Sequence, residues 1–196
     1  MIELPDWAVP NASTPAFIDA GGVMRSPINT AALKVNRPGS HYRWSTSFPP
    51  LSPERGRVIV SRLIRAQREG LRLPFRLAEP QPPAGAPVVD GVGQSGLNLA
   101  VRGLTPGLVI REGYWLSVPS FAGQHFLHNV AADVTVPANG RVIIPLSEML
   151  REPFLNSTPV FLERPMIEGL VEGSERAWSL SLEHLTSIEF TIEEAR

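Results

Sequence analysis

The apolar positions of the chain change their period twice between residues 42 and 77. A first group alternates with polar neighbours, as in a half-buried β-strand: Tyr42, Trp44, Thr46 and Phe48. A second group recurs at helical spacing: Ile59, Leu63 and Ala66, with Val60 and Ile64 beside them. A third group alternates again: Leu71, Leu73, Phe75 and Leu77. The pattern predicts strand, helix, strand, and this unit needs more sheet from elsewhere in the chain to bury its apolar side chains.

The predicted helix covers residues 53–69. Ser52 stands at the N-cap position and Pro53 at the first helical position. Glu54 lies in the first turn, where the helix dipole favours a carboxylate. Gly56 weakens that turn, and Gly70 is placed to end the helix in a left-handed conformation.

The middle of the chain has a different pattern of apolar and turn-forming residues. Residues 78–87 contain four prolines and a glycine, which predicts a linker. Between residues 97 and 171, short apolar segments and turn signals such as Asn139-Gly140 predict five or six strands. Residues 147–151 predict one helical turn. This spacing is typical of a small closed barrel of the OB or SH3-like kind.

After Gly173, apolar and polar residues alternate again, as they do in residues 42–48. Two segments alternate with polar residues: Trp178, Leu180 and Leu182, then Ile188, Phe190 and Ile192. These segments supply the strands that the opening unit lacks. We therefore expect a mainly β fold, a β-sandwich with one α-helix made from residues 1–83 and 172–196, interrupted by a small inserted β-barrel at residues 84–171.

The first forty residues predict an arm followed by a hairpin. Pro5, Pro10 and Asn11 oppose regular structure in residues 1–13, which either pack on their own domain or reach a neighbouring subunit. Short strands are expected at residues 16–24 and at the alternating positions Ala31, Leu33 and Val35. Pro and Gly at the centre of residues 37–40 predict a type II turn into the Tyr42 strand.

Composition supports a β-rich protein with an uneven distribution of charge. The 196 residues include 20 prolines, 16 glycines and no cysteine, with a net charge of -1. Many turns suit short strands, and the absence of cysteine excludes disulfides and thiolate metal sites. Residues 43–76 hold eight arginines against two glutamates, whereas residues 163–196 hold eight glutamates against three arginines. The two segments face each other either within one fold or between copies.

The arginines of the predicted helix are the strongest candidates for a partner surface. Arg62 and Arg65 share a face, and Arg55 lies two turns before Arg62. Three interpretations remain open for this ridge: a solvated face, a contact with the acidic C-terminus of a neighbouring copy, or a phosphate contact. The candidate interface residues are Arg55, Arg62, Arg65, Arg68, Trp7, Glu189 and Glu193.

The sequence contains no motif that predicts catalysis. There is no Walker loop, dinucleotide fingerprint, nucleophile elbow or zincin motif, and no helix pattern follows the glycine-rich residues 91–96. His125 and His128 are expected on opposite faces of a strand, so they are poorly placed to share a metal. Nothing places Ser120 on a strained elbow beside His125 and Asp133. We expect no enzyme activity and no catalytic, cofactor or metal site.

The order of these elements resembles the distal tail, or Dit-like, proteins of long-tailed bacteriophages. In the outer domain the resemblance covers the Trp44-Ser45-Thr46 strand, the Pro49-Pro50-Leu51 exit, the helix to Arg68 and Leu73-Pro74-Phe75. In the insert, the resembling segments are these: Gly103-Leu104, residues 107–110, residues 113–116, Asp133-Val134-Thr135 and Gly140. Together they span most of residues 40–194.

The resemblance implies a role and partners. Dit-like proteins have a β-sandwich carrying one helix and assemble as a ring, usually a hexamer, between the tail tube and the hub or fibres, with no catalytic residues. By that resemblance, this chain is made in the bacterial host cytoplasm and resides in the virion tail tip. Its partners are copies of itself, the tail tube protein and hub or fibre proteins. Neither a membrane nor a specific nucleic acid is expected, because no apolar run is long enough to span a bilayer and the net charge is near zero.

Two other functions remain open. The first is an OB-like binding module for an oligosaccharide or single-stranded nucleic acid, with four aromatic residues as candidate stacking surfaces: Tyr114, Trp115, Phe121 and Phe126. Basic residues are sparse there, with Arg102, Arg111 and Arg141 before Arg151. The second is another virion joining ring, such as a head-tail connector.

Overall fold

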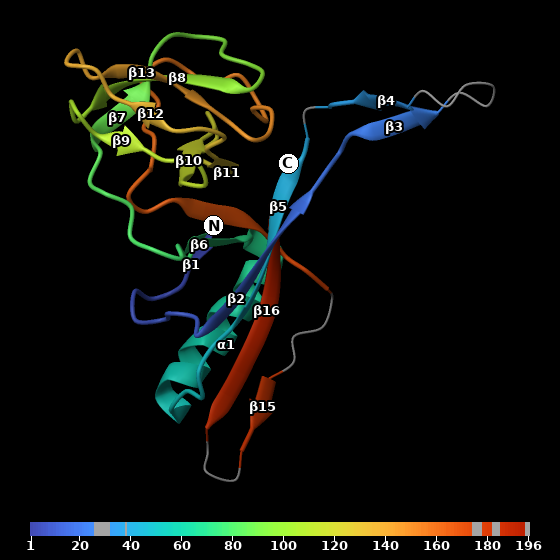
Figure 1. The fold of residues 1–196 in the computed structure, drawn as a ribbon. Coiled ribbons are helices and arrows are strands. Elements are labelled where there is room, and N and C mark those ends of the chain that lie inside the picture. Colours follow the sequence, from blue (N-terminus) through green and yellow to red (C-terminus); the bar gives the residue numbers. More distant parts are fainter. Residues whose placement is uncertain (26–31, 38, 174–177, 182–184, 195–196) are drawn as a thin grey trace. The chain divides into compact units, whose positions relative to one another are not determined.

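The computed structural model describes five ranges of the chain, residues 1–25, 32–37, 39–173, 178–181 and 185–194. The chain is mainly β, with 45% of its residues in strands and 9% helical. One helix accompanies several sheets, which is consistent with a β-sandwich carrying one helix (Figure 1). The predicted fold class is confirmed, whereas the inserted barrel is not.

The chain divides into two compact units. The first, here called the sheet unit, contains residues 1–16, 42–78 and 166–196. The second, here called the middle unit, contains residues 17–41 and 79–165.

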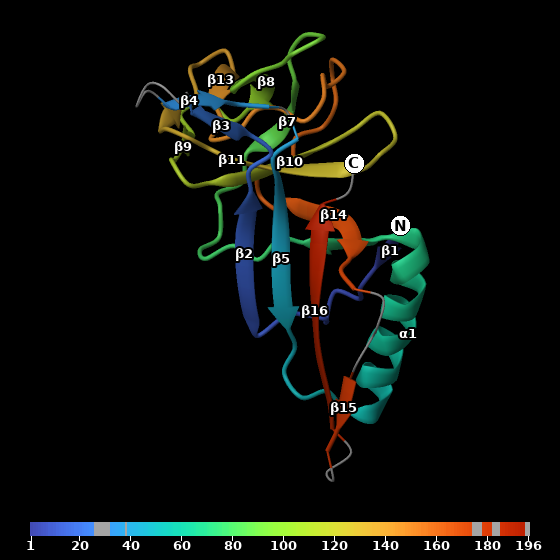
Figure 2. The same cartoon turned by 90° about the vertical axis from the view of Figure 1, so that its right-hand side faces the viewer.

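The sheet unit is built on one sheet and the helix α1 (Pro53–Glu69). The strands lie in the order β1 (Ile2–Glu3), β6 (Leu71–Pro74), β14 (Met166–Val171), β16 (Thr186–Glu194), β5 (His41–Ser47) and β2 (Ala12–Ile18). The short β15 (Trp178–Leu180) also pairs with β16. In Figure 2, β2, β5 and β16 run side by side.

The C-terminal strand completes the sheet as the alternating pattern predicts. In β16, Phe190 lies opposite Thr46 and Ile192 lies opposite Trp44. Trp44 is only 1% exposed, and its ring lies 5.7 Å from that of Phe75. The apolar stripe of α1 is buried too, so the positions that alternate along the strands and those at helical spacing form the core.

The helix begins and ends where the sequence predicts, but both caps differ in detail. Ser52 has extended backbone angles, and its side chain makes no capping hydrogen bond. Gly70 has φ 76° and ψ 164°, so its φ is positive as expected whereas its ψ is extended rather than left-handed helical. Gly56 is buried and lies close to Thr186. A Cβ at residue 56 would lie only 2.5 Å from the Thr186 Oγ1 atom, so the helix can approach Thr186 this closely only with glycine at this position.

The N-terminal arm packs on its own unit. Ile2 pairs with Leu71 in a parallel ladder, and its backbone N–H donates a hydrogen bond to the Gly70 carbonyl at 3.0 Å. The expectation that residues 1–13 lack regular structure is therefore wrong at Ile2–Glu3, and also at residues 12–13, where β2 begins. The buried Ile2 side chain, 6% exposed, favours this short strand despite the nearby Pro5.

One strand belongs to a different sheet from the one expected. Residues 167–171 were expected in the barrel, yet β14 pairs with β6 on one side and β16 on the other. Gly169 permits this close approach, because a Cβ there would lie 1.9 Å from the Glu193 carbonyl oxygen. An apolar strand has the same pattern beside either sheet, so its pattern could not identify its neighbours.

The middle unit contains small sheets around one apolar core. In the three-stranded sheet, β8 (Asn98–Leu104) lies between β7 (Gly85–Val89) and β13 (Arg141–Pro145). Two further sheets have two strands each: β10 (Trp115–Pro119) pairs with β11 (His125–Asn129), and β9 (Val109–Ile110) pairs with β12 (Val134–Thr135). Isolated bridges link further segments, for example Val130 with Leu146. The core residues Val101, Leu116 and Val118 are fully buried.

Two local predictions in the middle unit are wrong. The linker expected at residues 78–87 includes the start of β7, which pairs with β8 through an irregular register between Gly85 and Val88. The helical turn expected at residues 147–151 is absent. The N–H groups of Ser147 and Leu150 donate to the carbonyls of Asn129 and Gly96, so this segment bonds to distant backbone instead.

A separate hairpin forms from β3 (Gly22–Arg25) and β4 (Ala32–Val35). The strand expected at residues 16–24 is thus divided between the end of β2 and β3. Ala31, Pro38 of the predicted type II turn and Leu182 lie outside the described residues.

Candidate subunit interface

The candidate interface arginines on α1 contact residues of their own chain. The Arg55 guanidinium lies 5.1 Å from the centre of the Trp7 ring, a cation–π distance. The Arg62 guanidinium donates a hydrogen bond to the Glu3 carbonyl. These two arginines are therefore held against their own chain by neutral partners, which leave their positive charge in place.

Arg65 and Arg68 share a partner at the end of the helix. Their guanidinium groups lie 3.6 and 3.0 Å from the two carboxylate oxygens of Glu69. The hydrogen bond from Arg68, followed by the charges of Arg65 and Arg68, lowers the pKa of Glu69 despite some desolvation. Because these groups are largely exposed, the pairs add little to stability.

The acidic C-terminal segment is partly internal to the sheet unit. Glu168 is 1% exposed and accepts a hydrogen bond from the Arg72 guanidinium at 2.5 Å. The Glu194 carboxylate is also buried, and it accepts the backbone N–H of Tyr42 at 2.9 Å. Arg43 lies 3.5 Å from Glu172. The two oppositely charged segments therefore do meet within one chain.

The predicted interface residues are not brought together on one surface. Glu189 is exposed and Glu193 is half-buried, and both alternate with the buried residues of β16. The buried residues of β16 lie on the face that α1 contacts, so the two glutamates project from the other face of the sheet. The arginine ridge and the glutamate pair thus form two separate flanks of the sheet unit.

An apolar groove lies between α1 and β15, where the sequence analysis did not expect a site. Its volume is about 660 Å³, and its apolar lining includes Val60, Ile64 and Trp178, with Arg57 and Arg65 among its other lining residues. Ile64 is 53% exposed and Trp178 is 44% exposed. The signal was present in the sequence, because Val60 and Ile64 form a second apolar stripe beside the buried one.

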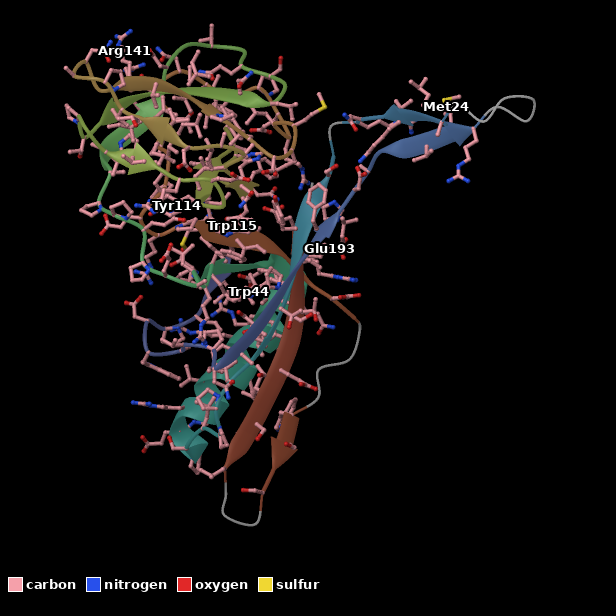
Figure 3. All side chains as sticks on the ribbon, in the orientation of Figure 1. Met24, Trp44, Tyr114, Trp115, Arg141 and Glu193 are labelled. Atoms are coloured by element: carbon pink, nitrogen blue, oxygen red, sulfur yellow. The ribbon has the colours of Figure 1, made fainter. Side chains whose placement is uncertain are left out.

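The β3–β4 hairpin exposes a second apolar surface. Every residue of β3 is exposed, and Met24 and Leu33 are each 64% exposed (Figure 3). The base of the hairpin is held by Asp19, whose carboxylate accepts the Gly21 N–H at 2.8 Å and lies 3.2 Å from the Lys34 ammonium.

The histidines of β11 form structural contacts. His125 and Ser117 are 3.2 Å apart, and the His125 ring packs 4.9 Å from that of Phe161. The fully buried His128 lies 2.9 Å from a Glu148 carboxylate oxygen. Within the described ranges, no group of three or more His, Asp or Glu residues is arranged to hold a metal.

The remaining candidate motifs are used to hold loops. The Ser120 hydroxyl accepts the Gln124 N–H at 3.2 Å, and the Asp133 carboxylate accepts the Glu112 N–H at 2.7 Å. The glycine-rich residues 91–96 lead into β8 rather than into a helix, and the Gln94 side chain binds the backbone of Ala100. These contacts explain the residues without a substrate or phosphate.

The four aromatic residues predicted as stacking surfaces do not form one continuous surface. Phe126 is 5% exposed, packs against Phe154 and is covered by the Arg151 guanidinium at 5.0 Å. Tyr114 packs partly buried against the core, and the Trp115 backbone is bound by the buried Gln81 side chain. Phe121 is the exception, at 90% exposed.

The basic residues of the middle unit are partly engaged as well. Arg102 donates hydrogen bonds to the Asp90 and Asn156 side chains at 3.2 and 2.7 Å. Arg141 lies 3.3 Å from the other carboxylate oxygen of Asp90. A groove for single-stranded nucleic acid would require these cations to face a phosphate backbone.

The chain was compared with models of known protein families and with curated proteins, and neither comparison found a match. In the part of the chain that the structure describes, no helix has the length and apolar character that a membrane span requires.

Proposed function

We propose that this chain is a structural ring subunit of the tail tip of a long-tailed phage, joining the tail tube to the hub or fibres. The observation that supports this proposal best is the position of β16, between β14 and β5. A sheet made from three separated segments of the chain, with one helix and a middle unit inserted in sequence, is the layout on which the resemblance to distal tail proteins rests.

The proposed mechanism is geometric. One flank of a subunit contacts the opposite flank of the next subunit, head to tail. Such contacts form a ring when the rotation that relates neighbouring subunits closes on itself. The arginines of α1 and the glutamates of the opposite sheet face give the subunit two different flanks. Charge complementarity between flanks fixes the register of neighbours more than it adds affinity. A catalytic role is not part of this proposal.

The rival binding module is favoured by one observation, the exposed ring of Phe121. An exposed aromatic side chain can stack on a base or a sugar ring. However, Phe126 is in the core, and Arg102 and Arg141 both bind the Asp90 carboxylate of their own chain, so the middle unit offers little continuous surface for either ligand.

Imaging of labelled particles tests the proposal. Virions produced by the phage that encodes this chain would be decorated with an antibody against the chain and viewed by electron microscopy. We expect label at the distal end of the tail. Label at the head-tail junction would assign the chain to a different joining ring, and particles that lack the chain altogether would contradict a virion role.

A further inference from the structure

The β3–β4 hairpin has one apolar and one basic face. Met24 lies directly opposite Leu33, and Gly22 lies opposite Val35, so these four residues share a face that carries no charge. Val23 lies opposite Lys34, and Arg25 lies opposite Ala32, on the other face. The ribbon is amphipathic, and its uncharged face is mostly open to water.

Such a face needs a partner to be stable. A two-stranded hairpin alone is only marginally stable in water, and apolar area left in water is unfavourable relative to buried apolar area. The Asp19 contacts hold the base of the hairpin, but they do not cover Met24 or Leu33. Burial of these two side chains in an assembly would stabilise both the hairpin and the contact.

The groove between α1 and β15 has complementary chemistry. Its apolar lining comes from Val60, Ile64 and Trp178, and cations lie among the other lining residues. An uncharged ribbon face can enter it without placing a charge against Arg57 or Arg65. The basic side chains of Arg25 and Lys34 lie on the other face of the ribbon and point away from the groove in this arrangement.

We propose that the apolar face of the β3–β4 hairpin of one copy packs into the α1–β15 groove of the next copy. This inference rests on the proposed ring and names the contact that forms it. A second copy is the occupant because the chain carries both halves, an exposed apolar hairpin face and an apolar groove of compatible charge. Such a pair gives a head-to-tail contact, which builds a ring or, if it does not close, a filament.

Disulfide trapping tests the contact directly, because the chain has no cysteine of its own. Met24→Cys and Ile64→Cys would be introduced into separate full-length chains, mixed, and oxidised at a concentration where the protein associates. We expect a disulfide-linked dimer that appears only in the mixture. Val58→Cys is the matched control on the same helix, since Val58 is 36% exposed but does not line the groove.

Two charge-inserting variants give an independent readout. Leu33→Glu damages the hairpin face and Ile64→Glu damages the groove, and both positions are exposed enough for the chain to fold. We expect each variant alone to be monomeric. Because each retains the half that the other has lost, an equimolar mixture should form a heterodimer and nothing larger, whereas Val58→Glu should associate like the unaltered chain.

The outcomes separate this contact from the ring itself. Oligomers that form without the Met24–Ile64 crosslink, and that survive both charge insertions, would overturn the contact and leave the ring proposal intact. Crosslinked open filaments would support the contact and contradict a closed ring. A chain that stays monomeric and uncrosslinked at every concentration would overturn both.

Discussion

Glu168 and Arg72 form the most enclosed ion pair described in the sheet unit, with side-chain exposures of 1% and 23%. Removal of one partner from such a pair leaves a buried charge uncompensated and typically costs 3–5 kcal/mol. We predict that Arg72→Gln, which leaves the buried Glu168 carboxylate without this partner, lowers the free energy of unfolding by about 3 kcal/mol, measured by urea unfolding. Glu172→Gln, in an exposed pair with Arg43, should cost less than about 1 kcal/mol. Equal costs would contradict this account.

Gly56 is the residue at which local propensity and tertiary packing disagree. Alanine is a better helix former by about 1 kcal/mol. A Cβ at residue 56, however, would lie 2.7 Å from the Thr186 Cβ, and such overpacking typically costs 1–3 kcal/mol. We predict that Gly56→Ala destabilises the protein in thermal unfolding. Gly22→Ala is the control, since no atom lies within 4 Å of the added Cβ, and a stabilised Gly56→Ala would refute the close approach.

Asp19 gives a pH-dependent prediction at the base of the hairpin. Hydrogen bonding from the Gly21 N–H, followed by the Lys34 interaction, lowers the pKa of Asp19. A lowered pKa means that the stabilisation is fully present above the ordinary aspartate range and is lost as pH falls through the lowered value. We predict that the Gly21 amide resonance titrates with a midpoint below that ordinary range. The titration should vanish in Asp19→Asn, whereas a midpoint within or above the ordinary range would contradict the contact.

Helix α1 shows how much of an element a local pattern can predict. Its bounds follow from Pro53, the apolar stripe and Gly70, because each acts through neighbours one or two turns away. The strands β5, β6 and β16 are likewise found by their alternation. Their partners are not, since β14 joins β6 and β16 through long-range contacts that an apolar period cannot specify. The α1–β15 groove was missed for the same reason.

Ser52 provides a test of how the N-terminus of α1 is stabilised. Loss of a serine that caps a helix through its side chain usually costs about 1 kcal/mol. Because the Ser52 side chain makes no capping hydrogen bond, we predict that Ser52→Ala changes the free energy of unfolding by less than about 0.5 kcal/mol. A loss of about 1 kcal/mol or more in urea unfolding would show that the hydroxyl does bind the helix terminus.

At the scale of the whole molecule, the charges counted along the sequence are partly paired within the fold. Counts of arginine and glutamate left open whether the two charged segments meet within one fold or between copies. The contacts of Arg72, Glu168 and Glu194 place part of this charge inside the sheet unit. Among the described residues, apolar side chains are left exposed on the hairpin and in the groove, and neither surface was predicted because each depends on what the fold leaves unburied. The account therefore attributes assembly to apolar contacts, with charge selecting the register.

The mass of the full-length protein in solution, measured by analytical ultracentrifugation over a range of concentrations, tests this account most directly. The account predicts one closed species at a fixed multiple of the monomer mass, a hexamer if the resemblance to distal tail proteins extends to ring order. It also predicts that Ile64→Glu dissociates this species and Val58→Glu does not. A protein that remains monomeric at every concentration would contradict the account.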